Sequence, residues 1–153
     1  MKCARSFWMF HHTVIDLDAL AQFAAHFLQV NPTGVFGLQG DLGVGKTAFV
    51  RSVVETLWAS YGHKAPRVIS PSYVLHQQYR LSDFVRVDHF DLYRLDTLTE
   101  EGLVEMGFME ALESAKTGSL LFVEWPERLP ALYSPERFLY FNFLEQGREI
   151  FWT

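Results

Sequence analysis

The segment from residue 40 to residue 47 combines the residue types that hold a triphosphate and its metal ion. It reads Gly40-Asp41-Leu42-Gly43-Val44-Gly45-Lys46-Thr47. Glycines let the backbone curl until successive N–H groups point at phosphate oxygens. The lysine adds a mobile cation for the β- and γ-phosphates, and the threonine hydroxyl is a ligand for Mg²⁺. We therefore predict that this segment binds ATP or ADP together with Mg²⁺.

The surroundings of this segment favour a phosphate-binding loop over a glycine-rich turn of another kind. A short apolar run from Val35 to Leu38 precedes the loop and predicts a buried strand. After Lys46, apolar side chains recur at helical spacing up to Trp58 and predict an amphipathic helix. Strand, loop and helix thus follow one another in the order that the motif requires. The residues predicted to bind the nucleotide are Asp41, Leu42, Gly43, Val44, Gly45, Lys46, Thr47 and Ala48.

A phosphate loop of this kind also needs an acidic residue near the metal, at the end of a neighbouring strand. Glu124 directly follows the apolar run of residues 120–123, and Asp91 follows a predicted strand over residues 84–90. Asp88 is a weaker third choice, because its place inside that strand suggests a strand face. Either Glu124 or Asp91 fits the role, and Glu124 has the cleaner context.

The remaining periodicity predicts the elements that position these residues. Residues 16–30 carry apolar side chains at helical spacing, with Asp16 as candidate cap. Thr97 with Glu100 is a candidate capping box for a helical region that reaches Lys116 and is broken near Gly107. Further strands are predicted within residues 1–12, 73–81, 84–90 and 120–123, and a hairpin over residues 137–144 and 148–152. The predicted fold class is α/β, with a central, mostly parallel sheet, antiparallel additions and flanking helices.

Length and composition predict one cytoplasmic domain spanning residues 1–153. The chain has 153 residues, which is the size of a single domain. Its one cysteine, Cys3, rules out a disulfide framework within the chain and favours a reducing compartment. No apolar run approaches the length of a membrane span. The net charge of −5, without a basic tract, argues against DNA binding, so we expect any RNA to be contacted mainly through a partner.

Four segments, taken in order, resemble those of the TsaE (YjeE) family, the small ATPases of bacterial tRNA threonylcarbamoyladenosine biosynthesis. The first is the phosphate loop, which alone is weak evidence for the family. The others are Ser70-Pro71-Ser72-Tyr73, His89-Phe90-Asp91-Leu92-Tyr93-Arg94-Leu95 and Val123-Glu124-Trp125-Pro126-Glu127. The last two segments together make the resemblance specific.

The resemblance implies a single P-loop ATPase domain that binds MgATP or ADP. It implies a complex with TsaB and TsaD, in which ATP use supports repeated cycles of tRNA modification and tRNA is met through the complex. By motif, Lys46, Asp91 and Glu124 are the catalytic residues, and Thr47 and Glu124 are the expected metal ligands. Ser72 lies in a switch-like loop over the nucleotide, and Trp125 lies beside it.

This sequence departs from the family pattern at two places. Ser72 stands where threonine is usual, which keeps the hydroxyl and loses the methyl group that restricts its rotamers. Ala48 stands where a second threonine is common. Neither change removes a group that the predicted phosphate or metal contacts need.

Two other functions are compatible with a phosphate loop. A small-molecule P-loop kinase usually brings arginines over the nucleotide in a lid, yet residues 96–123 hold only one basic residue, Lys116. A non-catalytic, nucleotide-dependent docking module would lack the metal ligand or the acids, whereas Thr47, Asp91 and Glu124 are all present. For His89 a structural hydrogen bond is favoured over catalysis.

Overall fold

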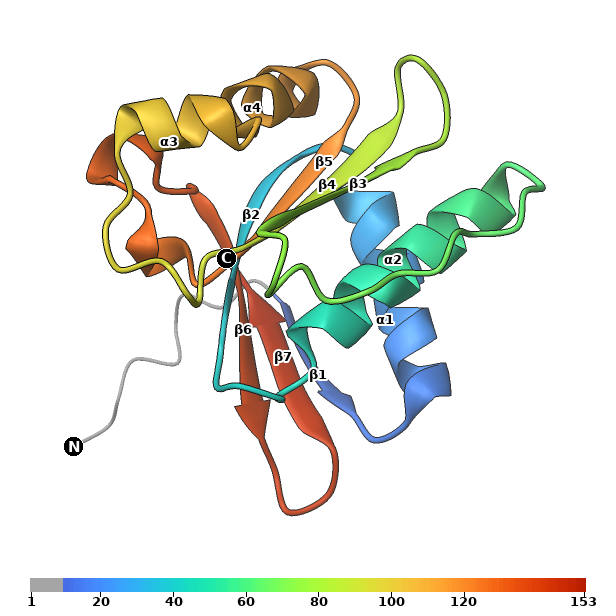
Figure 1. Cartoon of the computed structure of the whole chain (residues 1–153). Coiled ribbons are helices and arrows are strands. Elements are labelled where there is room, and N and C mark those ends of the chain that lie inside the picture. Colours follow the sequence, from blue (N-terminus) through green and yellow to red (C-terminus); the bar gives the residue numbers. More distant parts are fainter. Residues whose placement is uncertain (1–9) are drawn as a thin grey trace.

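A seven-stranded mixed sheet runs through the computed structural model, which describes residues 10–153 (Figure 1). The strand order is β1-β7-β6-β2-β5-β4-β3. The inner strands β6, β2, β5 and β4 are parallel neighbours, and β1, β7 and β3 add to them antiparallel. The strands are Phe10–Val14 (β1), Gly34–Gln39 (β2), His76–Arg80 (β3), Arg86–Asp91 (β4), Leu120–Glu124 (β5), Arg137–Phe143 (β6) and Arg148–Trp152 (β7). The predicted α/β fold with a parallel centre and antiparallel additions is confirmed.

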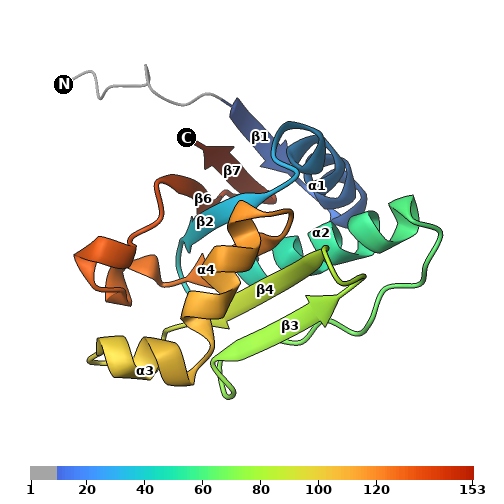
Figure 2. The ribbon, with the colours of Figure 1, turned by 90° about the horizontal axis from the view of Figure 1, so that it is seen from above.

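Two pairs of helices cover the two faces of the sheet (Figure 2). One face packs against α1 (Leu17–Val30) and α2 (Lys46–Ser60), and the other against α3 (Glu100–Glu105) and α4 (Phe108–Lys116). Each face has its own apolar core, because strands β4 and β5 are buried along their whole length. Short 3₁₀ turns, Pro126–Arg128 and Ala131–Tyr133, lead from β5 to β6. No helix within residues 10–153 has the length and apolar character needed to cross a membrane.

The helix ends follow from their capping residues. Asp16 caps α1, since its carboxylate accepts the backbone N–H of Ala19 at 2.8 Å. The predicted cap at Thr97 is wrong, because α3 begins two residues later. There the Thr99 hydroxyl accepts the N–H of Gly102 at 3.1 Å. The break predicted near Gly107 is confirmed, because that glycine has a φ of 81° and separates α3 from α4.

Two strands begin later than their sequence pattern predicts. Residues 71–75 form a turn in which the N–H groups of Val74 and Leu75 both bond to the carbonyl of Pro71, so β3 starts only at His76. Similarly, β4 starts at Arg86 and not at residue 84. The first predicted strand is present as Phe10–Val14, and its part before residue 10, with Phe7 and Trp8, lies outside the described residues.

Aromatic packing under α1 predicts a measurable stability difference. Phe27 is fully buried and its ring lies 4.9 Å from that of Phe36 and 5.3 Å from that of Phe49. Phe27→Ala should lower the free energy of unfolding by about 3–5 kcal/mol, because it removes apolar burial and leaves a cavity. Phe84, in the β3–β4 turn, is 81% exposed. Phe84→Ala should therefore change the unfolding free energy by less than about 0.5 kcal/mol in the same urea titrations. Equal losses in the two variants would contradict this assignment of the core.

Candidate functional site

Three parallel neighbours, β2, β5 and β4, end at the same edge of the sheet, and each leads into a predicted site segment. The loop of residues 40–45 follows β2, and β5 and β4 end at Glu124 and Asp91. The register places Leu38 of β2 beside Glu124, and Glu124 beside Asp91. Because neighbouring strands lie about 4.8 Å apart, both acids come close to the phosphate loop.

The loop itself needs glycine at its turning points. Gly40 has a φ of 154°, and a Cβ there would stand 2.6 Å from the carbonyl oxygen of Phe141. Gly45 has a φ of 113° and immediately precedes α2. The first backbone N–H groups of a helix have no intrahelical acceptor, and they carry the positive end of the helix dipole. The loop therefore offers an anion site at the start of α2.

Lys46 is the buried cation of this loop. Its Nζ donates to the carbonyl oxygens of Gly40 and Asp41, at 2.5 and 3.1 Å. Burial lowers the pKa of the Lys46 ammonium below its ordinary value, and the nearby carboxylates of Glu124 and Asp91 partly oppose that shift. The lysine thus lies in the phosphate loop with a carboxylate nearby at the end of β5 and another at the end of β4.

Glu124 connects the phosphate loop to the middle of the sheet. Its Oε1 accepts the Thr47 hydroxyl at 2.8 Å and also lies 2.8 Å from Nε2 of His89. Glu124 is almost completely buried and His89 is completely buried. The two predicted metal ligands, Thr47 and Glu124, are therefore side by side at the start of α2.

Asp91, the last residue of β4, contacts a different loop. Its Oδ2 accepts the hydroxyl of Ser72, and its Oδ1 accepts the backbone N–H of Tyr93 at 3.0 Å. Ser70 hydrogen-bonds to Ser72 at 2.8 Å. The Arg94 guanidinium stacks over the Tyr73 ring, with its Cζ 4.3 Å from the ring centroid. Asp91 thus fixes the loop of residues 70–74 beside the phosphate loop.

Trp125 lies between these two parts of the site. Its ring centroid is 4.7 Å from Nζ of Lys46 and 5.0 Å from the ring of Tyr93. Its backbone is left-handed, with a φ of 58°, directly after Glu124. The indole Nε1–H is buried and has no hydrogen-bond acceptor among the described residues. A buried N–H without a partner is unusual in folded proteins.

The donor set of this edge fits Mg²⁺ only together with a phosphate. Thr47 and Glu124 provide one hydroxyl and one carboxylate, whereas residues 10–153 contain no cluster of three or more His, Cys, Asp or Glu that could hold a metal. Mg²⁺ in proteins is commonly bound by one or two carboxylates plus substrate phosphates. The site therefore has the composition expected for a nucleotide-bound magnesium ion and not for an independent metal centre.

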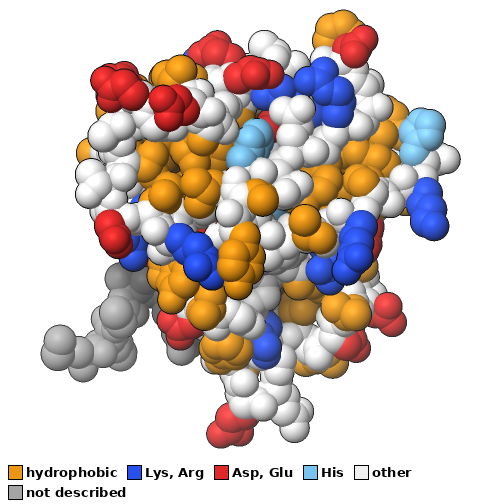
Figure 3. Space-filling model, viewed as in Figure 1, with side chains coloured by type: hydrophobic (Ala, Val, Ile, Leu, Met, Phe, Trp, Pro, Cys, Tyr) orange, Lys and Arg blue, Asp and Glu red, His pale blue; other side chains and the backbone are white. Residues whose placement is uncertain are grey.

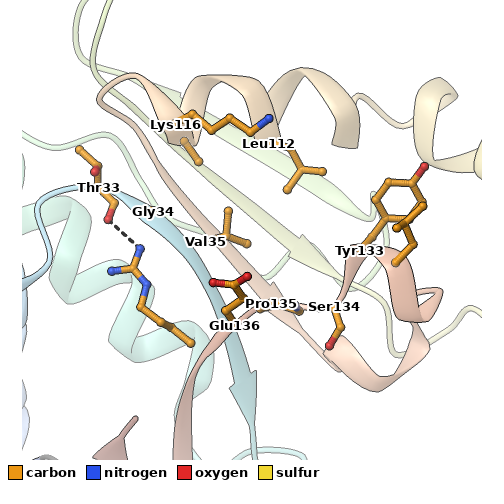
Figure 4. A pocket seen from close by; sticks show the side chains of 12 residues that line it. Thr33, Gly34, Val35, Leu112, Lys116, Tyr133, Ser134, Pro135 and Glu136 are labelled. Atoms are coloured by element: carbon orange, nitrogen blue, oxygen red, sulfur yellow. Dashed lines mark hydrogen bonds between the residues drawn. The ribbon is translucent and has the colours of Figure 1, made fainter.

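Two pockets help to delimit the site. One, of about 240 Å³, adjoins the phosphate loop at Val44, Gly45 and Ala48 and is otherwise lined mainly by apolar residues of the chain ends, including Leu20 and Ile150. The other, of about 530 Å³, is lined by residues such as Gly34, Lys116 and Glu136 (Figure 4). Gly34 begins β2, so this second pocket lies at the opposite end of the sheet and is separate from the candidate site.

Comparison with known proteins identifies the family. The model of threonylcarbamoyl adenosine biosynthesis protein TsaE matches residues 14–150. The chain belongs to the TsaE family. The family's role lies in tRNA threonylcarbamoyladenosine biosynthesis. The TsaE resemblance of the four sequence segments is thereby confirmed.

Individual TsaE proteins are similar along most of their length. The chain is 34% identical to TsaE of Rickettsia typhi over 125 residues, which cover 81% of this chain and 79% of the relative. It is 37% identical to TsaE of Synechocystis over 120 residues, covering 78% and 71%. A crystal structure of YdiB from Bacillus subtilis superimposes with a TM-score of 0.60 at 25% identity, covering 94% of this chain and 84% of that one.

The predicted site residues of this TsaE chain fall into three groups. Lys46, Thr47, Glu124 and Trp125 meet at the phosphate loop. Asp91 and Ser72 form a second group, one strand further along the sheet. The other predicted contacts, Asp41, Leu42, Gly43, Val44, Gly45 and Ala48, lie along the loop and the first turn of α2, with Leu42 exposed and Val44 buried.

His89 is the site residue whose contact the sequence analysis did not identify. A structural hydrogen bond was predicted for it, and that bond goes to Glu124. Successive residues of a strand face opposite sides, so His89 shares a face with Asp91 and not with Asp88. That alternation was visible in the sequence and places His89 on the same side of the sheet as the phosphate loop.

The contact between Ser72 and Asp91 predicts how the loop of residues 70–74 is held. Ser72→Ala should increase amide hydrogen exchange within this loop, because a hydrogen bond to a charged group contributes about 1.5–3 kcal/mol. Ser72→Thr keeps the hydroxyl and should leave exchange at the wild-type level. Exchange in α4, on the other face, serves as the internal reference. Unchanged exchange in Ser72→Ala would show that Asp91 does not hold the loop.

Proposed function

We propose that this chain is a P-loop ATPase that binds MgATP and ADP and acts with the TsaB–TsaD pair in tRNA threonylcarbamoyladenosine synthesis. The observation that carries the proposal is the contact between Thr47 and Glu124 at the start of α2, beside Lys46. A hydroxyl, a carboxylate and a cation at one helix N-terminus are the groups that a bound nucleotide triphosphate and its metal require.

Each side chain has a defined part in this proposal. Lys46 neutralises phosphate charge. When a nucleotide binds, its ammonium group leaves the loop carbonyls and donates to phosphate oxygens instead. The Thr47 hydroxyl and the Glu124 carboxylate supply oxygen ligands for Mg²⁺, which when bound would neutralise the charge that develops on the phosphates. Asp91 holds the loop of residues 70–74 through Ser72, so this loop is the candidate segment for responding to the γ-phosphate.

The apolar pocket beside the phosphate loop is the proposed seat of the nucleoside. It adjoins Val44, Gly45 and Ala48 and is lined by Leu20 and Ile150 among others, so it continues directly from the anion site. Binding pockets for cofactors are commonly apolar, with a few polar groups that fix orientation. Its position supports ATP or ADP as the ligand in preference to free phosphate.

Surface charge supports contact with tRNA through partners. Acidic side chains gather over α3 and α4, at the upper left of Figure 3. They are Glu100, Glu101, Glu105, Glu110 and Glu113, all exposed. The net charge of the chain is −5. Since RNA binding relies on neutralising phosphates, this face disfavours RNA, and TsaB and TsaD are the proposed route to the tRNA.

The first test is ADP formation from MgATP, by the purified chain alone and with the TsaB–TsaD pair. We expect slow turnover alone and a changed rate with the pair. Lys46→Ala should lower ADP formation by about tenfold or more, because it removes a charge-assisted contact. Lys116→Ala, at the opposite end of the sheet, should not. Unchanged turnover in Lys46→Ala would refute the phosphate site, and turnover indifferent to the pair would favour a small-molecule kinase.

Glu124→Gln should separate hydrolysis from nucleotide binding. The amide retains the size of the side chain but loses the charge that would face the metal, so ADP formation should fall by about 10²-fold. Binding of ADP in EDTA, measured by calorimetry, should stay within about threefold of wild type, because Lys46 and the loop amides remain. Glu136→Gln, an exposed acid at the other end of the sheet, is the matched control. A normal rate in Glu124→Gln would move the metal role to Asp91.

A further inference from the structure

His89 is a fully buried histidine placed next to a proposed metal ligand. It lies in β4, beside Phe122 of β5, and its Nε2 is 2.8 Å from Oε1 of Glu124. We assign the Nε2–H tautomer to this ring, so that His89 donates to the carboxylate oxygen. The other ring nitrogen, Nδ1, is buried and has no partner in the described part of the chain. The contact with Glu124 is therefore the hydrogen bond that orients this ring.

The two hydrogen bonds to the Glu124 side chain fall on the same oxygen. Oε1 accepts from both Thr47 and His89, whereas Oε2 receives no hydrogen bond from residues 10–153. The contact from Thr47 comes from the phosphate loop, and its hydroxyl can bind a metal ion through an oxygen lone pair while still donating to Glu124. The contact from His89 comes from within the sheet and does not depend on the phosphate loop.

We propose that His89 is a positioning residue that fixes the Glu124 carboxylate so that its free oxygen faces the nucleotide-bound Mg²⁺. This inference rests on the proposed function, because it concerns a metal that arrives with the nucleotide. Groups that hydrogen-bond to a metal ligand orient it, and their removal commonly costs about 10–100-fold in metal affinity or activity. His89 would thus act on Mg²⁺ affinity through Glu124, without touching the nucleotide.

His76 provides a matched comparison on the other face of the same sheet. Its Nε2 lies 2.7 Å from Oδ1 of Asp88, and the other oxygen, Oδ2, accepts from Nε of Arg86 at 2.7 Å. Arg86 in turn pairs with Glu110 of α4. This is again a histidine bound to a buried carboxylate, but Asp88 and His89 face opposite sides of β4. Loss of His76 should affect stability without affecting the nucleotide site.

The test compares ADP binding in EDTA and in excess MgCl₂, followed by titration of MgCl₂ at saturating ADP. In His89→Leu, the Mg²⁺ concentration for half-maximal response should rise about tenfold, with ADP affinity in EDTA within about twofold of wild type. His89→Gln, whose amide nitrogen can reach Glu124, should recover most of the Mg²⁺ response. His89→Asn, which is too short to reach, should not, and this pair decides the matter if His89→Leu does not fold. His76→Leu should lower the melting temperature and leave the Mg²⁺ response unchanged.

Any of four results would overturn the inference. Equal losses in EDTA and in MgCl₂ would assign His89 a purely structural role. A wild-type Mg²⁺ response in His89→Leu, or equal behaviour of the Gln and Asn variants, would show that the hydrogen bond does not position Glu124. Failure of the wild-type chain to bind ADP under either condition would refute the proposed function itself, and with it this inference.

Discussion

The shared carboxyl edge of β2, β5 and β4 is the constraint on which the candidate site depends. Parallel pairing fixes the register, so that Glu124 lies between Leu38 and Asp91 on the neighbouring strands. The phosphate loop can begin only where β2 ends, and the acids can approach it only where their own strands end. Helices on both faces keep these strands buried and thereby hold the edge in place. Sheet register, more than any single loop, brings the chemistry of this TsaE chain together.

This arrangement concentrates unfavourable features at one edge. Lys46, His89, Asp91 and Glu124 are buried polar groups, and burying charge is costly unless hydrogen bonds and opposite charges compensate. Trp125 immediately follows Glu124 in a left-handed conformation, and residues held so cost about 1–3 kcal/mol each. Such strain persists where the surroundings enforce it. The strained residue Trp125 directly follows the candidate metal ligand Glu124. Strain at this position is typical of a functional site, where some stability is lost for the sake of activity.

Much of the fold could be predicted because its signals are local. A few neighbouring residues are enough to predict the apolar stripe of α2, the helix cap at Asp16 and the apolar run of β5. The start of β3 could not be predicted, since the turn at residues 71–75 depends on hydrogen bonds to Pro71 and on the carbonyl of Leu75 accepting from Asp91. The partner of His89 likewise depends on which strand lies beside β4. Local sequence pattern predicts that the two acids lie at strand ends. Which side chains each acid contacts depends on how the strands pair in three dimensions, and local pattern does not predict that.

The two acids contact two different loops, so one carboxylate could not hold both of them at this edge of the sheet. Glu124 contacts the phosphate loop through Thr47, and Asp91 contacts the loop of residues 70–74 through Ser72. Since the two acids are register partners on adjacent strands, the two loops share one rigid support. Serine in place of the usual threonine keeps the hydroxyl that Asp91 needs and leaves its rotamer less restricted. The position of this loop then depends on the Asp91 hydrogen bond and on stacking of Arg94 over Tyr73.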